Sequence, residues 1–440
     1  MQEYFFQLVE DLTGRLRGSQ VLLANYEGEE SDFVRFNRSR IRQAGSVSQR
    51  YVSVELVDGQ RHARSTITLT GEAGADLEQL QQALERLDSD LPNLPEDPYL
   101  LYSTEVSNTQ QIGQSVLPEA DEAVREVLEA GEGRDLVGIY SAGAMDRGFA
   151  NSLGQRNWFT AHSFHLDWCF YRQVDKAVKT SYADFRWDDE AFSRKVALAG
   201  EQLETLAGEP KTIKPGGYRV YLAPPALNEL FGLLAWGGFG LKDHRTRNTS
   251  LLKMIEKDAT LAETVTLREN TREGLAPNFE SSGFLKPNAV TLIDHGKLSQ
   301  TLVSPRSAKE YGVETNGAST GEFPASLDMD AGEIPAEEAP SRLDTGVYVN
   351  TLWYLNYSDR PAGRITGMTR FATFWVEGGR IVAPLNVMRF DETIYRAMGE
   401  NLLGLTAQRD FLPSSETYQS RSTDSARLPG ALIEDFQLTL

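Results

Sequence analysis

The chain has 440 residues, of which 40% are hydrophobic and 24% are charged, proportions that are usual for soluble globular proteins. This length predicts two or three domains rather than a single core. The formal net charge of −19 at pH 7 argues against non-specific binding to nucleic acid, because phosphate contacts need a basic surface.

Three further features predict a cytoplasmic protein that does not associate with membranes. No apolar run approaches the roughly 20 residues needed to span a bilayer. Residues 1–12 carry acidic side chains where an export signal would carry Lys or Arg. The single cysteine, Cys169, excludes an internal disulfide and is typical of a reducing compartment.

The first half of the chain predicts a domain that mixes helices and strands. Helical spacing of apolar residues predicts helices at 4–17, 76–88, about 119–130 and 188–207, the last of them capped by acidic residues. Alternating apolar runs predict strands at 21–26, 33–37, 51–57, 63–69, 136–141, 158–170 and 180–187. Asp58-Gly59 predicts a hairpin turn between two of these strands. We expect an N-terminal domain of residues 1–207, which includes the connecting helix 188–207.

Pro and Gly residues near 207–217 indicate a boundary, after which we expect a C-terminal domain of residues 215–440. A strand at 218–222 precedes a helix at 225–236, a Gly-rich break and a second helix near 249–256. Strands follow at 347–357 and 368–377, and Gly378-Gly379 turns the latter into a hairpin with 380–389. The predicted fold class is therefore α+β, with an α/β-mixed N-terminal domain followed by a β-rich C-terminal one.

Histidine and cysteine side chains are the first candidates for metal binding or catalysis. His162 and His165 lie on one predicted strand, where residues three apart point to opposite faces, so one ion could not easily meet both rings. Cys169 shares a face with His165, but a thiol–imidazole pair would need distortion, and a buried, inert cysteine is the favoured interpretation. The motifs of serine hydrolases and phosphate-binding loops do not occur.

A basic cluster surrounds His244 and Arg245 in this otherwise acidic chain. It precedes a predicted helix N-terminus near Thr249, where the local field favours an anion such as a peptide carboxylate. A solvated loop is the alternative interpretation, because charge clusters are usually solvated. His244 and Arg245 are therefore candidates for substrate binding.

Aromatic residues crowd the predicted strands 347–357 and 368–377. Alternation turns about half of these rings away from the core, so an exposed edge there could accept a substrate peptide as an added strand. A mixed core with a subunit interface explains the same pattern equally well. The substrate-binding candidates in this segment are Trp353, Tyr354, Asn356, Tyr357 and Arg370.

Four segments carry a resemblance to a known family: Asn151-Ser-Leu-Gly154, Leu292-Ile-Asp-His-Gly-Lys-Leu298, Ser307-Ala-Lys-Glu-Tyr-Gly312, and Phe374-Trp-Val-Glu-Gly-Gly-Arg-Ile381 followed by Pro384. In order and spacing they resemble the motifs of the TldD/PmbA (TldE) family, also called modulators of DNA gyrase. The resemblance spans nearly the whole chain. It implies PmbA/TldD-like N-terminal and C-terminal domains.

Active TldD-type members resemble zinc peptidases, in which two histidines of a His-Glu-x-x-x-His motif and a cysteine bind zinc and the glutamate activates the bound water. When the family's Thr-Ser is placed on Thr249-Ser250, the motif positions fall on Leu233, Leu234 and Gly238. None of these can bind zinc or accept a proton. His-Glu-x-x-x-His occurs nowhere in the chain, and the C-terminal region has no cysteine. We therefore expect no catalytic residue and no metal in this chain.

The resemblance thus implies a non-catalytic, TldE/PmbA-like subunit of a zinc metallopeptidase complex that acts on unfolded peptides or small proteins. Its partner would be a TldD-type subunit that holds the zinc, in a heterodimer or a higher assembly, and peptidase activity is expected only with that partner. Three alternatives remain open at this point: a stand-alone homodimeric peptide-binding protein, a hydrolase with a different site around His244, and a regulator that contacts DNA gyrase.

Overall fold

The computed structural model describes residues 1–173 and 176–440 and confirms the α+β class. The elements of the N-terminal half are α1 (Gln2–Thr13), β1 (Val21–Asn37), β2 (Arg40–Asp58), β3 (Arg61–Thr68), α2 (Ala73–Asp90), β4 (Thr109–Ile112), α3 (Ala120–Ala130), β5 (Asp135–Asn151), β6 (Arg156–Gln173), β7 (Lys176–Asp184) and α4 (Asp189–Thr205).

The C-terminal half is richer in strands. Its elements are β8 (Gly216–Leu222), α5 (Pro224–Gly238), α6 (Leu241–Arg245), α7 (Leu252–Lys257), β9 (Leu267–Glu269), β10 (Val290–Asp294), β11 (Lys297–Leu298), α8 (Pro305–Tyr311), β12 (Ser326–Met329), α9 (Ala339–Leu343), β13 (Gly346–Asp359), β14 (Arg364–Glu377), β15 (Arg380–Pro384), β16 (Arg389–Thr393), β17 (Leu402–Pro413) and β18 (Ser425–Leu438).

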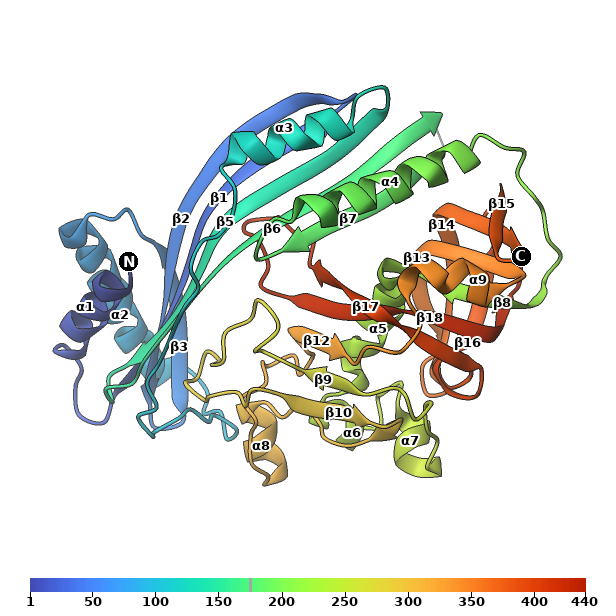
Figure 1. Ribbon diagram of the computed structural model, residues 1–440. Helices are drawn as coiled ribbons and strands as arrows, with labels where there is room; N and C mark the ends of the chain where they lie inside the picture. Colours follow the sequence, from blue (N-terminus) through green and yellow to red (C-terminus); the bar gives the residue numbers. More distant parts are fainter. Residues whose placement is uncertain (174–175) are drawn as a thin grey trace.

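Long strands form a sheet that arches across the N-terminal half (Figure 1), in the order β3-β2-β1-β5-β6-β4, with β7 also on β6. The predicted hairpin is confirmed: Asp58 pairs with Arg61, and Gly59 has the positive φ, 62°, that this turn requires. The prediction of two short strands at 21–26 and 33–37 is wrong, because β1 is continuous. Its polar middle still pairs on both sides, since ladder hydrogen bonds need only the backbone.

Helices cover one face of this sheet. α3 and α4 pack at one end of the sheet, with α4 running along β7 beside the C-terminal half, and α1 and α2 pack at its other end (Figure 1). The predicted cap of α4 is confirmed, because the Asp188 side chain accepts a hydrogen bond from the backbone N–H of Ala191 at 2.8 Å. Under the helices, even-numbered residues of β6 such as Phe164 and Trp168 are buried. Odd-numbered residues, among them His165, face the concave side, so the two histidines of β6 point apart as predicted.

In the C-terminal half, strand pairing closes into a ring. The order is β8-β13-β14-β16-β18, and β18 pairs back onto β8. β12, β9, β10 and β11 continue the sheet from β18, while β17 pairs with β18 and β15 with β14. Helix α5 packs against β13 and β18 and contributes Leu227, Phe231 and Leu234 to the C-terminal core, all of them fully buried.

The two halves share apolar packing. One cluster joins Trp168 of β6 and Leu203 of α4 to Tyr348 of β13 and Phe374 of β14. A second cluster packs Phe149 of the first sheet against residues 275–279 of the C-terminal half. The first cluster lies on the helix-covered face of the sheet and the second on its concave face, where α5 and β17 also lie close to β6 and β7.

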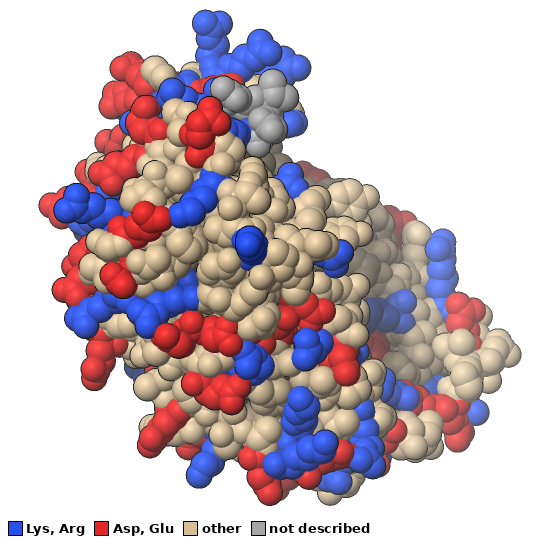
Figure 2. Space-filling view, turned by 90° about the vertical axis from the view of Figure 1, so that its right-hand side faces the viewer, with Lys and Arg blue, Asp and Glu red and all other residues tan. Residues whose placement is uncertain are grey.

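The outer surface of the C-terminal half carries both signs of charge, with acidic and basic side chains interspersed over the face shown in Figure 2. None of the helices in the described ranges has both the length and the apolar character that crossing a membrane would take.

Candidate functional site

Helix α5 ends at the positions that the resemblance aligns with the zinc motif. Leu234 is fully buried in the C-terminal core, and Leu233 packs partly against that core. The helical geometry breaks at Trp236 (φ −73°, ψ 92°) and Gly237 (φ 79°, ψ 11°), so Gly238 lies beyond the continuous helix. Within the described ranges, no cluster of three or more His, Cys, Asp or Glu side chains is arranged to hold a metal ion.

Side chains from the end of β13 and from the β13–β14 connection hold the end of α5. The Tyr357 hydroxyl donates a hydrogen bond to the carbonyl oxygen of Leu233 at 2.8 Å. The Arg360 guanidinium donates to the carbonyl oxygen of Trp236 at 3.0 Å. The last carbonyls of a helix have no intrahelical partners, so these donors stabilise the break. The end of α5 is therefore occupied by structural contacts.

His244 and Arg245, both in the short helix α6, have different neighbours. Nε2 of His244 lies 2.6 Å from the carbonyl oxygen of Gly238, and burial lowers the pKa of the ring, so the neutral imidazole donates this bond. The Arg245 guanidinium lies 6.0 Å from the ring centre of Tyr311. The predicted helix start near Thr249 is wrong, because α7 begins further along the chain. The helix N-terminus expected to favour an anion is thus displaced from this cluster.

Trp353, Tyr354 and Arg370 come together in the middle of the β13–β14 pair, beside a register shift between Trp353 and Asn356. The guanidinium carbon of Arg370 lies 3.8 Å from the ring centre of Trp353, and the rings of Trp353 and Tyr354 are 5.5 Å apart. Tyr354 is 76% exposed and has a φ of 58°, a left-handed value that is strained for a bulky residue. A cavity of about 400 Å³ lies beside Trp353 and Arg370, between this strand pair and the ends of β6 and β7.

Asn356 and Tyr357 do not line this cavity. Asn356 is exposed, and its Oδ1 accepts a hydrogen bond from the backbone N–H of Tyr357 at 2.8 Å, while the Tyr357 ring reaches α5. The expected open edge is partly occupied, because β13 pairs with β14 on one side and through Val347–Val349 with β8 on the other. The structure thus divides the substrate-binding candidates among the Trp353 cavity, the end of α5 and the surroundings of Arg245.

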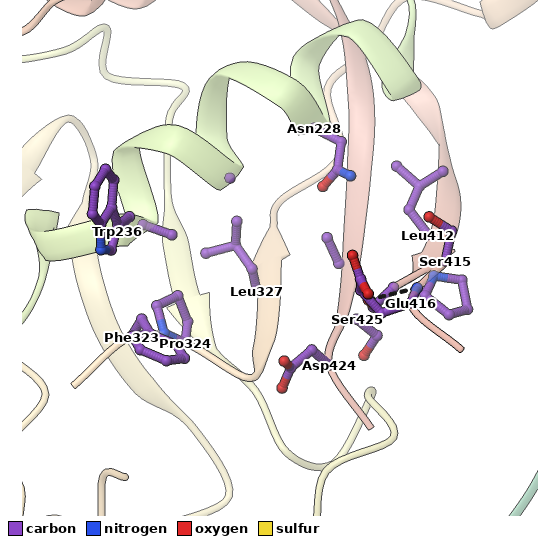
Figure 3. Close-up of a pocket in the computed structure, with 15 residues that line it drawn as sticks. Asn228, Trp236, Phe323, Pro324, Leu327, Leu412, Ser415, Glu416, Asp424 and Ser425 are labelled. Carbon is purple, nitrogen blue, oxygen red and sulfur yellow. Dashed lines mark hydrogen bonds between the residues drawn. The ribbon is translucent and has the colours of Figure 1, made fainter. Parts of the chain in front are cut away.

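A larger cavity beside α5 was not predicted from the sequence. Its volume is about 510 Å³, and it lies between α5, the start of β12 and the segment that joins β17 to β18. In Figure 3 the rings of Trp236 and Phe323 lie at one end, the carboxylates of Glu416 and Asp424 at the other, and Leu327 between them.

A second cavity of about 100 Å³ adjoins the first. The two share Asn228, Leu412, Pro413 and Ser415, and the second reaches the concave face of the arch at His165 and Lys179. We call the two cavities together the α5 cleft. The spacing of Asn228, Gly232, Ala235 and Trp236 along one side of α5 is the local signal that could have indicated it.

His165 faces the α5 cleft from β6. Burial lowers the pKa of its ring to about 4, although the nearby Asp167 carboxylate opposes this shift. On the same face, burial raises the pKa of the Cys169 thiol to about 11, so it stays protonated at neutral pH. In the part of the chain that the structure describes, no hydrogen bond joins the ring to the thiol. An activated thiol–imidazole pair is therefore not formed here.

The shifted pKa of His165 predicts a loss of stability in acid. An unfolded histidine takes up a proton near pH 6.5, while this ring stays neutral in the folded protein down to about pH 4. The unfolded state therefore binds more protons in this window, and the free energy of unfolding should fall as the pH decreases from 6.5 to 4. In the His165→Asn variant, the fall in the free energy of unfolding over this pH window should be smaller by at most about 3 kcal/mol. This is an upper limit, because the ring is partly exposed.

Denaturant titrations at the two ends of this pH window would test the prediction. The control is His295→Asn, because His295 is exposed at a turn and Asn tolerates its positive φ of 46°. The control should keep the wild-type stability at neutral pH, which shows that a histidine-to-asparagine replacement is tolerated at the surface. An unchanged pH dependence in the His165→Asn variant would contradict the role assigned to its burial.

Residues 215–440, more than half of the chain, match the family described as the PmbA/TldA metallopeptidase C-terminal domain. The chain belongs to the TldD/PmbA family. A comparison with curated proteins gave no match.

Solved structures of similar fold cover 99% of this chain. TldE from Thermococcus kodakarensis aligns over 100% of its own length with a TM-score of 0.77 and 15% identity. A putative modulator of a DNA gyrase from Thermotoga maritima aligns over 99% of its length, with a TM-score of 0.75 and 15% identity. One from Bacteroides thetaiotaomicron aligns over 98%, with a TM-score of 0.74 and 14% identity. At these identities the likeness establishes the shared fold.

Proposed function

We propose that this chain is the non-catalytic, TldE/PmbA-like subunit of a TldD/TldE-type zinc metallopeptidase complex that acts on unfolded peptides or small proteins. The observation that carries the proposal is the chemistry of the segment aligned with the zinc motif. Leu233, Leu234 and Gly238 offer no nitrogen, oxygen or sulfur side-chain ligand and no general base, and Leu234 is part of the core. A zinc peptidase needs both side-chain ligands for the metal and a general base.

The geometry around these positions supports the same proposal. The break at Trp236 and Gly237 removes the regular helix on which two histidines would be presented together. The carbonyl groups freed by the break already accept hydrogen bonds from Tyr357, Arg360 and His244. The residues present do not fit a zinc ion, and the metal of the complex is assigned to the TldD-type partner.

The α5 cleft supports a role in holding peptide. It combines exposed rings with a few polar groups in a concave site, which is the usual composition of a ligand-binding cavity. The complex would operate in the cytoplasm, in keeping with a chain that has one cysteine.

Activation by a partner is the test of this function. The chain is co-expressed with a TldD-type protein from the same genome, and hydrolysis of a fluorescently labelled unfolded peptide is measured for each protein and for the pair. We expect no hydrolysis by this chain alone, hydrolysis by the pair, and co-elution of the two in size-exclusion chromatography.

A partner whose His-Glu-x-x-x-His glutamate is replaced by glutamine serves as the control and should leave the pair inactive. The proposal fails if this chain hydrolyses the peptide by itself, or if the partner's rate is the same with and without it.

A further inference from the structure

We propose that the α5 cleft selects extended peptide segments in which a lysine or arginine side chain lies next to apolar residues. The inference rests on the proposed peptide-binding function and adds to it the charge class of the segment that this subunit would hold.

The acidic side of the cleft carries three carboxylates, all of which belong to exposed residues. Glu416 and Asp424 line the larger cavity and Glu229 the smaller one, and none of them forms a salt bridge with any residue of the described ranges. Burial raises the pKa of Glu229 more than the charge of Lys179 lowers it. Burial also raises the pKa of Asp424, against a hydrogen bond with Ser422 and the charges of Lys286 and Arg147. A partly desolvated carboxylate without a partner gains from a bound cation.

The basic group in the cleft is already paired. Lys179 lines the smaller cavity, and its Nζ lies 3.2 Å from a carboxylate oxygen of Asp167. This pair is close to neutral, so the unbalanced charge of the cleft is that of the three carboxylates. These carboxylates would repel an anionic side chain of a peptide, whereas they would attract a lysine or arginine side chain.

The opposite end of the larger cavity is apolar and open. Trp236 is 61% exposed and Phe323 is 44% exposed, and they lie beside Pro324 and Leu327 (Figure 3). Exposed rings grouped at a concave surface are typical of binding sites. The Arg360 guanidinium, 5.5 Å from the ring centre of Trp236, holds one face of the indole. Apolar residues of a peptide would pack here while its cation reaches the carboxylates.

The size of the cleft favours a short segment of chain. The larger cavity, of about 510 Å³, lies in the range of roughly 300–1,000 Å³ that holds small ligands, and the adjoining cavity of about 100 Å³ extends it; neither is large enough for a folded domain. Asn228 and Ser415, which line both cavities, place an amide and a hydroxyl where the backbone of an extended peptide would pass. The occupant that fits is therefore unfolded and cationic at one position.

The test uses the full chain and two end-blocked, fluorescein-labelled peptides that differ only in a central Leu-Lys-Leu or Leu-Glu-Leu. Fluorescence anisotropy at low salt measures their affinities. We expect the lysine peptide to bind about tenfold more tightly, which corresponds to about 1.4 kcal/mol. The double variant Glu416→Gln/Asp424→Asn should lose most of this preference, and Glu229→Gln should reduce it.

A matched control separates the cleft from the overall charge of the protein. The double variant Glu132→Gln/Glu314→Gln removes two exposed carboxylates that do not line the cleft and changes the net charge by the same amount. It should keep the wild-type preference. Equal affinities for the two peptides, equal effects of the two double variants, or no binding of either peptide would overturn the inference. The subunit assignment would survive these outcomes, because it depends on zinc content and on activation by a partner.

Discussion

Replacing Leu234 by glutamate should unfold the C-terminal half rather than begin to rebuild a zinc site. Leu234 is fully buried among apolar residues of α5, β13 and β18. Losing a buried leucine side chain costs about 2–5 kcal/mol, and an unpaired buried carboxylate adds several more. The sum is comparable to the roughly 5–15 kcal/mol by which whole domains are stable. The triple variant Leu233→His/Leu234→Glu/Gly238→His should fail for the same reason.

Thermal and denaturant unfolding would measure this loss. Leu234→Met is the matched control, because a volume-conserving swap should cost less than about 1.5 kcal/mol. Gly238→Ala should also be mild, since its new methyl group would meet Ser250 Oγ at 3.5 Å, an ordinary contact. A Leu234→Glu variant with nearly wild-type stability would show that this part of α5 is not packed as described.

Replacing Arg421 by methionine should detach the segment between β17 and β18 from the N-terminal sheet. Arg421 is only 5% exposed, and its guanidinium donates to the hydroxyl and carbonyl oxygens of Ser163 at 2.7 and 3.1 Å. It also reaches the carbonyl oxygen of Gly143 at 3.4 Å. Only glycine fits at position 143, which supplies this acceptor, because its φ is 145° and a Cβ there would collide with the carbonyl oxygen of Glu30. Burial lowers the pKa of Arg421 to about 10, which leaves it charged at neutral pH.

The expected cost of Arg421→Met is about 3 kcal/mol, because hydrogen bonds to a buried charge are lost and their acceptors stay buried. Residues 414–416 and 424 line the α5 cleft, and hydrogen exchange across 414–424 and proteolysis near the exposed Tyr418 should both increase. Arg342→Met is the control: Arg342 is an exposed partner of Glu338, and its loss should cost less than about 1 kcal/mol. Unchanged exchange in 414–424 would contradict the anchoring role.

Local patterns in the sequence predicted much of the N-terminal half. The alternation in β6 and the acidic cap at Asp188 are both confirmed, because each depends on neighbours within a few residues. The length of β1 was missed, since its middle, Glu27–Asp32, is polar and carries no apolar alternation. Pairing with β2 and β5 keeps that stretch extended, and a local pattern does not report such pairing.

The closure of the C-terminal strands into a ring could not be predicted from local sequence patterns. Strands such as β12 and β16 are too short to show a period. The predicted hairpin arm 380–389 is confirmed only as β15, which ends at Pro384, and β16 begins at Arg389. The return of β18 to β8 joins residues near 432 to residues near 221, a contact set by the fold as a whole.

In the candidate site, too, only the features that depend on a local sequence pattern could be predicted. The apolar motif positions of α5 were visible in the sequence, but the cleft beside them needs α5, the start of β12 and residues 412–426 together. These segments are far apart along the chain. No local spacing could place Glu416 and Asp424 opposite Trp236.

The central claim is that this chain carries no catalytic metal site of its own, and zinc content tests it most directly. The chain is expressed without a partner in zinc-supplemented medium, purified without chelators, and analysed for bound zinc by elemental analysis. We expect only trace zinc relative to protein, with no peptidase activity in the same sample. Stoichiometric zinc accompanied by hydrolysis of an unfolded peptide would contradict it.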